Sequence, residues 1–146
     1  MAEKMIRTFS VEETEAAGKD LGDRIKNAGG AYIALFGDLG AGKTAFTRGV
    51  VSVLAPGARV HSPTYTIVND YSRKGAGYRV YHFDMYRITD EDSLYSTGYC
   101  DYLTDDSFVI VEWCENIEDL LPVPRIEVHI EYAGDNERII TETEIG

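Results

Sequence analysis

The chain has 146 residues, of which 44% are hydrophobic, with a formal net charge of −11 and an isoelectric point near 4.6. This length and composition predict a single domain, residues 1–146, that is large enough to build its own core. No stretch approaches the ~20 apolar residues of a membrane span, and so acidic a surface repels phosphate backbones, which argues against stand-alone binding of nucleic acid.

The first part of the chain predicts a short strand, a helix and a buried strand. Residues 6–9 favour a strand, and Ser10 with Glu13 three residues later forms a capping box, the pattern of a helix start. The helix is expected to run to about Lys26. The residues expected on its buried face are Val11, Thr14, Ala17, Leu21 and Ile25. The next run, Ala31–Phe36, is apolar on both faces, which predicts a central strand covered by helices.

The segment after this strand, Gly37 to Thr44, matches the phosphate-binding loop G-x-x-x-x-G-K-[ST], and a helix-competent run to Leu54 follows it. Glycines let the backbone approach an anion, and the loop and helix N-terminus offer N–H donors to phosphate. Lys43 can reach the β- and γ-phosphates, and the Thr44 hydroxyl can ligate Mg²⁺. The expected nucleotide-binding residues of this segment are Asp38, Leu39, Gly40, Ala41, Gly42, Lys43, Thr44 and Ala45.

The second half of the chain alternates strands with short helices. Residues 65–71 and 78–84 predict a β-hairpin. The further expected elements are a helix at 90–96 capped by Asp90 or Thr89, an irregular segment or short helix at 98–103, a strand at 108–111, a helical turn at 117–121, an alternating strand at 125–132 and a closing strand at 137–145. Apolar strands beside helices, together with alternating hairpins, predict an α/β fold with a mixed sheet.

Two predicted strands end in an acid, one at Asp84 and the other at Glu112. Ligands of open α/β sheets bind at the carboxyl ends of strands, where either acid could hold Mg²⁺ or orient an attacking water. A loop cap or an ion pair is the structural alternative for each, and the sequence leaves open which acid touches the metal. Trp113 follows Glu112 and either packs in the core or contacts the base or a partner.

The hydroxyl-rich stretch Ser62, Thr64 and Thr66 follows the P-loop helix. It resembles in composition the segments that GTPases order on the γ-phosphate, although a turn held by side-chain hydrogen bonds is the alternative. The chain has neither Asn-Lys-x-Asp nor Asp-x-x-Gly, which argues against an ordinary GTPase. It also offers little room for the lid and acceptor pocket of a kinase. A small ATPase or an ATP-switched binding module is therefore favoured, and a compact small-molecule kinase is the less favoured alternative.

The remaining histidines and cysteines carry less information. His82 lies two residues from Asp84 on the same strand face and is interpreted as a structural histidine, while His129 is expected to be solvated. Cys100 and Cys114 form no C-x-x-C pair and are expected to be buried or half-buried thiols of a reduced protein. The N-terminal residues lack a signal-peptide pattern, so we expect a cytoplasmic protein.

Four sequence blocks resemble the bacterial TsaE family, formerly called YjeE, in their order along the chain. They are Gly37-Asp-Leu-Gly-Ala-Gly-Lys-Thr44, Ser62-Pro-Thr-Tyr-Thr-Ile-Val-Asn-Asp-Tyr71, His82-Phe-Asp-Met-Tyr-Arg87 and Val111-Glu-Trp113. The resemblance covers about residues 8 to 132. It implies a P-loop NTPase-like three-layer fold, with a parallel core flanked by antiparallel strands.

This resemblance also implies an ATPase that supports threonylcarbamoyl modification of adenosine in tRNA. The implied cofactors are ATP and Mg²⁺. The implied partners are TsaD and TsaB, a pair that ATP hydrolysis would reset between turnovers, with tRNA reached only through that complex. An ATP-dependent docking module with little hydrolysis of its own is the alternative.

Carried over by residue, the family resemblance implies phosphate binding by Lys43 and Mg²⁺ binding by Thr44 and Glu112. Asp84 would be the acid of the hydrolytic site and a second metal-side group, and Thr64 would belong to the switch-like loop. The further residues expected near the nucleotide are Ser10, Trp113 and Arg138. Ala45 and Cys114 depart from the commoner family residues without removing a charge or a main-chain donor, while the divergent last hairpin weakens the assignment of Arg138.

Overall fold

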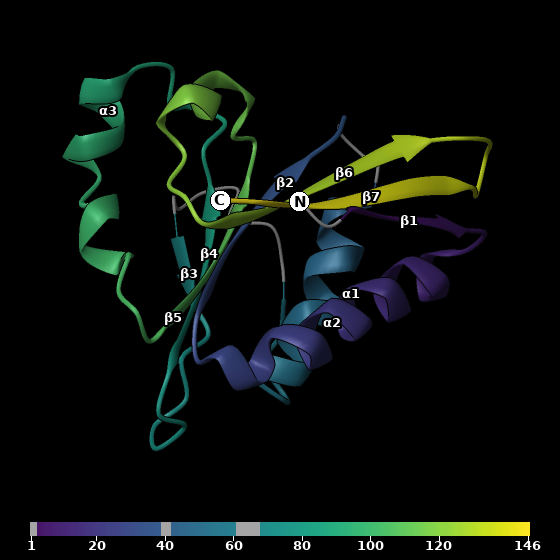
Figure 1. Ribbon diagram of the computed structural model, residues 1–146, viewed down its shortest axis with the longest axis horizontal. Helices are drawn as coiled ribbons and strands as arrows, with labels where there is room; N and C mark the ends of the chain where they lie inside the picture. The colour runs from purple at the N-terminus through teal and green to yellow at the C-terminus, as the bar shows by residue number, and fades with distance from the viewer. Residues whose placement is uncertain (1–2, 39–41, 61–67) are drawn as a thin grey trace.

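A computed structural model describes residues 3–38, 42–60 and 68–146. Figure 1 shows a twisted sheet whose strands run in the order β1-β7-β6-β2-β5-β4-β3. The elements in chain order are β1 (Glu3–Thr8), α1 (Val11–Ile25), the 3-10 helix η1 (Lys26–Ala28), β2 (Ala31–Phe36), α2 (Lys43–Leu54), β3 (Val68–Asp70), β4 (Arg79–Asp84), α3 (Glu91–Ser96), the 3-10 helix η2 (Tyr99–Tyr102), β5 (Ser107–Glu112), the 3-10 helix η3 (Glu115–Leu120), β6 (Arg125–Tyr132) and β7 (Arg138–Ile145).

The sheet is mixed, and its parallel strands lie at the centre. Strand β2 pairs in parallel with β5 on one side and β6 on the other, and β4 extends the parallel part beyond β5. The outer pairs, β1·β7, β6·β7 and β3·β4, are antiparallel. The predicted arrangement of a parallel core with antiparallel flanks is confirmed, and the carboxyl ends of β2, β4 and β5 meet at one edge.

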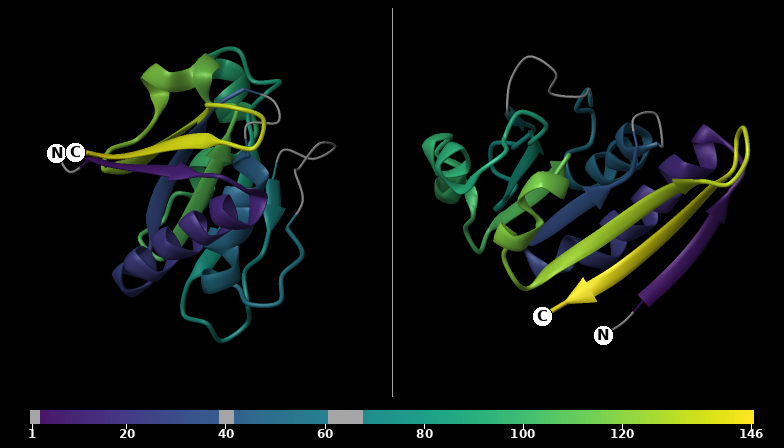
Figure 2. Two further views of the ribbon diagram at one scale, coloured as in Figure 1. Left: turned by 90° about the vertical axis from the view of Figure 1, so that its right-hand side faces the viewer. Right: turned by 90° about the horizontal axis from the view of Figure 1, so that it is seen from above.

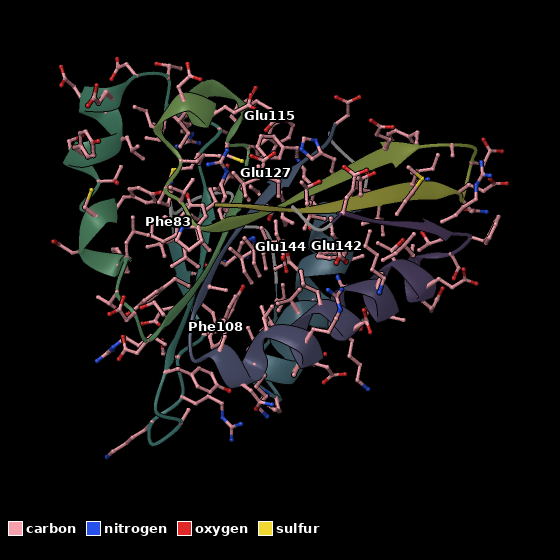
Figure 3. The ribbon with its side chains drawn as sticks, viewed as in Figure 1. Phe83, Phe108, Glu115, Glu127, Glu142 and Glu144 are labelled. Atoms are coloured by element: carbon pink, nitrogen blue, oxygen red, sulfur yellow. The ribbon has the colours of Figure 1, made fainter. Side chains whose placement is uncertain are left out.

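Helical segments cover both faces of the sheet (Figures 1 and 2). Helices α1 and α2 lie against one face, while α3, η2 and η3 lie on the other. Each face has its own apolar cluster, one containing Phe108 with residues of α1 and α2, the other containing Phe83 with residues of α3, η2 and η3. Figure 3 labels both phenylalanines. Burial on both faces explains why β2 and β5 consist of almost continuous apolar residues.

Helices α1 and α2 cross at glycines. A Cβ atom built on Gly49 would lie 1.9 Å from the carbonyl oxygen of Glu15, and one built on Gly18 would lie 2.0 Å from the carbonyl oxygen of Phe46. The backbones of the two helices are therefore in direct contact, an approach that only glycine allows. This crossing sets the position of α2, and with it the position of the P-loop lysine at the start of that helix.

Most of the predicted elements are present, with shifts of a few residues at their ends. The predicted helix start is confirmed, but only half of the capping box forms. The Glu13 amide donates to Ser10 Oγ at 3.1 Å, whereas Glu13 Oε1 accepts from the amide of Phe9, one residue before the cap, at 2.9 Å. Asp90 rather than Thr89 caps α3, since its carboxylate accepts from the Ser93 amide at 2.7 Å.

Two expectations about burial were wrong. Val11 is 61% exposed, because the first residue of α1 precedes the turn that packs on the sheet. Cys100 is exposed, whereas Cys114 is buried as expected. Among the described residues, no helix combines the length and the apolar character that crossing a membrane requires.

Candidate nucleotide site

Asp84 and Glu112 stand opposite each other at the carboxyl edge of the sheet. They are register partners at the ends of the parallel strands β4 and β5, and Leu35 of β2 is the neighbour of Glu112 on the other side. Glu112 is 3% exposed, while Asp84 is half-buried. The two strand-end acids are therefore neighbours, and parallel pairing is the cause, since it aligns strand ends that lie far apart in sequence.

Lys43 begins α2 directly beneath this edge. Only 5% of the residue is exposed. Its Nζ donates to the Gly37 carbonyl oxygen at 2.7 Å and lies 3.4 Å from the centroid of the Trp113 ring. The ammonium is thus held by the first P-loop residue on one side and by an aromatic face on the other, a cation–π arrangement.

Trp113 reaches Lys43 through an unusual backbone conformation. Its φ is 58°, in the left-handed region that residues other than glycine rarely adopt. The Trp113 ring also meets the Tyr86 ring edge-on at a centroid distance of 5.2 Å, and Tyr86 is 63% exposed. Strained residues of this kind gather at functional sites. The structure therefore favours the site interpretation of Trp113 over simple core packing.

Burial shifts the pKa values of the charged groups at this edge. The pKa of Lys43 is lowered by burial, an effect that the carboxylates of Glu115, Glu112 and Asp84 oppose. The pKa of Asp84 is raised, first by burial and then by the negative charge of Glu112. Buried and half-buried charged groups therefore crowd a small space, as is common where a protein binds a charged ligand.

Glu112 is held in place by His82, a wholly buried residue of β4. The His82 Nε2 and Glu112 Oε2 atoms share a short hydrogen bond. His82 was expected to be a structural histidine. It is wholly buried, as such a residue would be, but its hydrogen bond goes to a carboxylate of the candidate site. The signal was present in the sequence, since His82 and Asp84 share a strand face, although only the pairing of β4 with β5 identifies Glu112 as the partner.

Ser10 caps α1, and Arg138 begins β7. Thr14, one turn after Ser10, approaches the loop, since a Cβ built on Gly42 would lie 3.4 Å from Thr14 Cγ2. Arg138 is the register partner of Thr8 and of Tyr132. Its guanidinium lies 4.2 Å from the Tyr132 ring centroid and donates to the carbonyl oxygen of Glu137 at 2.9 Å. Thus α1 and the β6–β7 hairpin approach the end of the P-loop together, although Arg138 is engaged within its own hairpin.

A pocket of about 460 Å³ lies beside the start of the P-loop. Its lining runs from Phe36 to Asp38 on one side and from His129 to Tyr132 on the other. The rings of Phe36 and His129 are stacked, with centroids 4.5 Å apart and an interplanar angle of 7°. His129 Nε2 also lies 3.2 Å from Glu127 Oε1. The His129 side chain is 42% exposed, so it is partly solvated as expected, but pairing of β6 with β2 also places its ring on Phe36.

The oxygen ligands at this edge suit Mg²⁺. Proteins usually hold this ion through one or two carboxylates, and it keeps several waters and substrate oxygens. Asp84 and Glu112 offer two carboxylates, whose mutual repulsion a cation would relieve, and the half-buried Thr44 lies next to Lys43. Within the described ranges, no group of three or more His, Cys, Asp or Glu side chains could hold a metal ion by itself. The residues thus fit an ion that shares its ligands with a substrate.

Some predicted site residues fall outside the structural description. These are Leu39, Gly40, Ala41 and Thr64. Of the rest, Lys43, Asp84, Glu112 and Trp113 form one cluster, while Gly42, Thr44 and Ala45 belong to the start of α2. Sequence reasoning missed the contributions of Tyr86 and Glu115. Figure 3 labels Glu115 at the beginning of η3.

Comparison with known proteins decides the family. Residues 8–140 match the family model described as "Threonylcarbamoyl adenosine biosynthesis protein TsaE". The chain belongs to the TsaE family. Two curated relatives are proteins called tRNA threonylcarbamoyladenosine biosynthesis protein TsaE. The one from Haemophilus influenzae is 42% identical over 116 residues, covering 78% of this chain and 72% of the relative. The one from Bacillus subtilis is 40% identical over 140 residues, covering 96% and 85%.

A solved structure is similar over nearly the whole length of this TsaE-family chain. The crystal structure of YdiB from Bacillus subtilis superposes with a TM-score of 0.76 at 34% sequence identity, covering 99% of this chain and 87% of that one. The arrangement of strands and helices described above is therefore shared with an experimentally determined relative.

Replacing Asp84 by asparagine is expected to raise the thermal stability of the TsaE-family chain. The folded protein raises the pKa of Asp84 above its ordinary 3.8, so it binds the proton more tightly than the unfolded chain does. Stability is therefore lost as the pH rises from about 3.8 through the folded pKa, and the loss persists at neutral pH. Asparagine removes the charge and keeps an oxygen for the Tyr86 amide, which now donates to Asp84 Oδ1 at 2.8 Å.

The measurement is thermal unfolding of wild type and Asp84→Asn from pH 3.5 to pH 8 without nucleotide. The gain in melting temperature should be largest near pH 7 and should vanish at the acid end. Asp90→Asn is the matched control, because helix capping lowers the pKa of Asp90. That variant should lose stability at neutral pH. A lower melting temperature for Asp84→Asn at pH 7 would contradict the assigned cost of burying its charge.

Proposed function

We propose that this chain is a P-loop ATPase that serves the formation of threonylcarbamoyladenosine in tRNA. The observation that carries the ATPase part is the cluster of Lys43, Asp84 and Glu112 at the carboxyl edge of β2, β4 and β5. A strand, the G-x-x-x-x-G-K-[ST] segment and a helix come in that order, as P-loop NTPase-like folds require. The tRNA part rests on membership of the TsaE family and on the names of its curated relatives.

In this proposal each residue of the cluster has a separate task. Lys43 places its ammonium against the phosphates, and the amides at the start of α2 donate to them. Thr44 and Glu112 hold Mg²⁺, which supplies neutralisation of phosphate charge when it is bound. Asp84 orients the attacking water, for which a carboxylate with a raised pKa is suited, because it can accept a proton more readily than an ordinary aspartate. Trp113 and Tyr86 exclude bulk water from that side.

The position of Lys43 supports the proposal that the isolated protein has weak activity. Its ammonium already donates to the Gly37 carbonyl and lies on the Trp113 ring. It must leave both contacts before it can bind a phosphate. We propose that the TsaD and TsaB proteins bind this chain and favour the rearranged state. The acidic charge of the chain suits a role in which tRNA contacts only its partners.

The proposal is tested by measuring ATP binding and phosphate release with and without Mg²⁺, TsaD and TsaB. We expect tight binding, slow release by the chain alone and faster release in the complex. Glu112→Gln should still bind ATP but release phosphate at least about 100-fold more slowly, because it removes a charged ligand of the Mg²⁺ that stabilises charge on the transferred phosphoryl group.

The same assay separates the alternatives. Binding without hydrolysis, even with both partners present, would replace the ATPase with an ATP-dependent docking module. Full activity of the isolated chain would contradict stimulation by partners. Phosphate that appears on an added acceptor rather than in water would support a kinase. Absence of ATP binding by the wild type would remove the proposal altogether.

A further inference from the structure

The buried contact between His82 and Glu112 has no part in the functions assigned above. His82 is wholly buried, and its Nε2 is bonded to Glu112 Oε2. The contact joins the neighbouring strands β4 and β5 diagonally. His82 is the register partner of Ile110, and Glu112 lies two residues farther along β5, opposite Asp84. A buried histidine here is costly unless it is needed, because an apolar residue would fill the same core position without desolvating a polar ring.

The geometry of Glu112 shows what this contact does. Oε2 is engaged by His82, while in the part of the chain that the structure describes no donor is bonded to Oε1. A carboxylate that ligates a cation accepts hydrogen bonds and cannot donate them, so this role of Glu112 requires the His82 tautomer with its proton on Nε2. One carboxylate oxygen is thereby fixed, and the rotation of the carboxylate group is fixed with it.

We propose that His82 is a positioning residue that orients the Glu112 carboxylate for binding a divalent cation. The inference rests on the proposed function, in which Glu112 is a magnesium ligand. Carboxylates that ligate metals are commonly held by hydrogen bonds from residues behind them, and loss of such a partner costs about 10- to 100-fold in metal affinity. His82 acts through Glu112 and does not touch the cation or the substrate.

The ring contacts of His82 support this role. The Tyr71 ring lies at a centroid distance of 6.2 Å from the imidazole, on the side of the edge strand β3. In addition, the amide of Met85, just beyond β4, donates to the Glu112 carbonyl oxygen at 2.9 Å. Main chain and side chain of Glu112 are therefore both held by the β4 segment. That segment also carries Asp84, so one strand places both acids.

The test uses two replacements of His82 that differ in the reach of their amide. Glutamine can place its amide N–H near the position of Nε2, whereas the shorter asparagine cannot reach Glu112. Magnesium affinity is measured by titrating Mg²⁺ into the ATP-bound protein by calorimetry, and Mn²⁺ binding by electron paramagnetic resonance gives a second readout. We expect His82→Asn to weaken the cation about tenfold or more and His82→Gln to stay within about threefold of the wild type.

The controls separate positioning from general loosening of the strand. Tyr81→Phe changes the neighbouring buried residue of β4, which faces the other core, and should leave cation affinity unchanged. ATP binding in EDTA should be the same in all variants. Equal cation affinity in His82→Asn and wild type would overturn the inference, as would equal weakening in His82→Asn and His82→Gln.

A measurement on the wild-type protein makes the test independent of how the variants fold. Nitrogen-15 spectra should show His82 protonated at Nε2, with its N–H proton shifted downfield by the hydrogen bond, both before and after Mg²⁺ and ATP are added. Protonation at Nδ1 alone would overturn the inference. A wild type that binds ATP without any response to Mg²⁺ would instead remove the proposed magnesium role of Glu112, and the spectra would still report whether the hydrogen bond exists.

Discussion

Lys43→Ala is expected to weaken ATP binding about 100-fold. A hydrogen bond between charged groups contributes up to about 3 kcal/mol, and loss of the ammonium removes this contribution from the phosphates. The effect is large because Lys43 is the only cation in the P-loop sequence, and because the residue is only 5% exposed, in surroundings where charge interactions are strong. Calorimetric titration with ATP and Mg²⁺ measures the change directly.

Arg48→Ala is the matched control for this prediction. Arg48 lies on the same helix and also carries a positive charge, but its guanidinium is exposed and pairs with Glu15 at 3.4 Å. Its removal should change ATP affinity by less than about threefold, since exposed ion pairs and distant charges are screened by salt. If Lys43→Ala bound ATP like the wild type, the P-loop assignment would be wrong, and the proposed function would lose its foundation.

Gly49→Ala is expected to destabilise the fold by about 3 kcal/mol, which lowers the melting temperature by roughly 10 °C. The added Cβ would lie 1.9 Å from the Glu15 carbonyl oxygen and 2.7 Å from the Lys19 amide nitrogen. Neither backbone atom can move without separating α1 from α2. The gain of about 1 kcal/mol that alanine brings inside a helix does not offset this clash.

Gly134→Ala is the comparison for that substitution. Gly134 lies in the β6–β7 turn, and the nearest atoms to a Cβ there belong to the Glu137 side chain at 3.5 Å or more. Chemical or thermal denaturation should show a change below about 0.5 kcal/mol for this variant. An unchanged melting temperature for Gly49→Ala would show that the helices do not pack at the observed distance. Because α2 begins with Lys43, the destabilised variant should also bind ATP more weakly.

The site depends on the fold through this same helix crossing. The glycines of α1 and α2 let the helices lie in backbone contact, and the start of α2 is thereby fixed beneath the ends of β4 and β5. A lysine on a helix placed farther out would be more solvated and would interact less with Glu112. Core packing and the charges of the site are therefore coupled. Gly18 and Gly49 have this effect although both lie outside the phosphate-binding motif Gly37–Thr44.

Much of the architecture follows from local sequence signals. The apolar run of β2, the capping box at Ser10 and the strict alternation of β6 each predicted their element, because the period of apolar residues and the chemistry of a helix start act over a few neighbours. The P-loop is likewise a local motif. The sequence also predicted that two strands end in an acid, although only the parallel pairing of β4 with β5 makes Asp84 and Glu112 neighbours.

The sequence by itself determined these elements, the P-loop and the two acids, because each is set by contacts between near neighbours in the chain. The tertiary structure alone decided that His82 bonds Glu112, that Lys43 lies on Trp113 and that His129 stacks on Phe36. Those partners are separated by tens of residues. Strand order and register determine these contacts. Both are set by burial of apolar surface over the whole sheet, a free energy to which all strands contribute and which no single segment encodes.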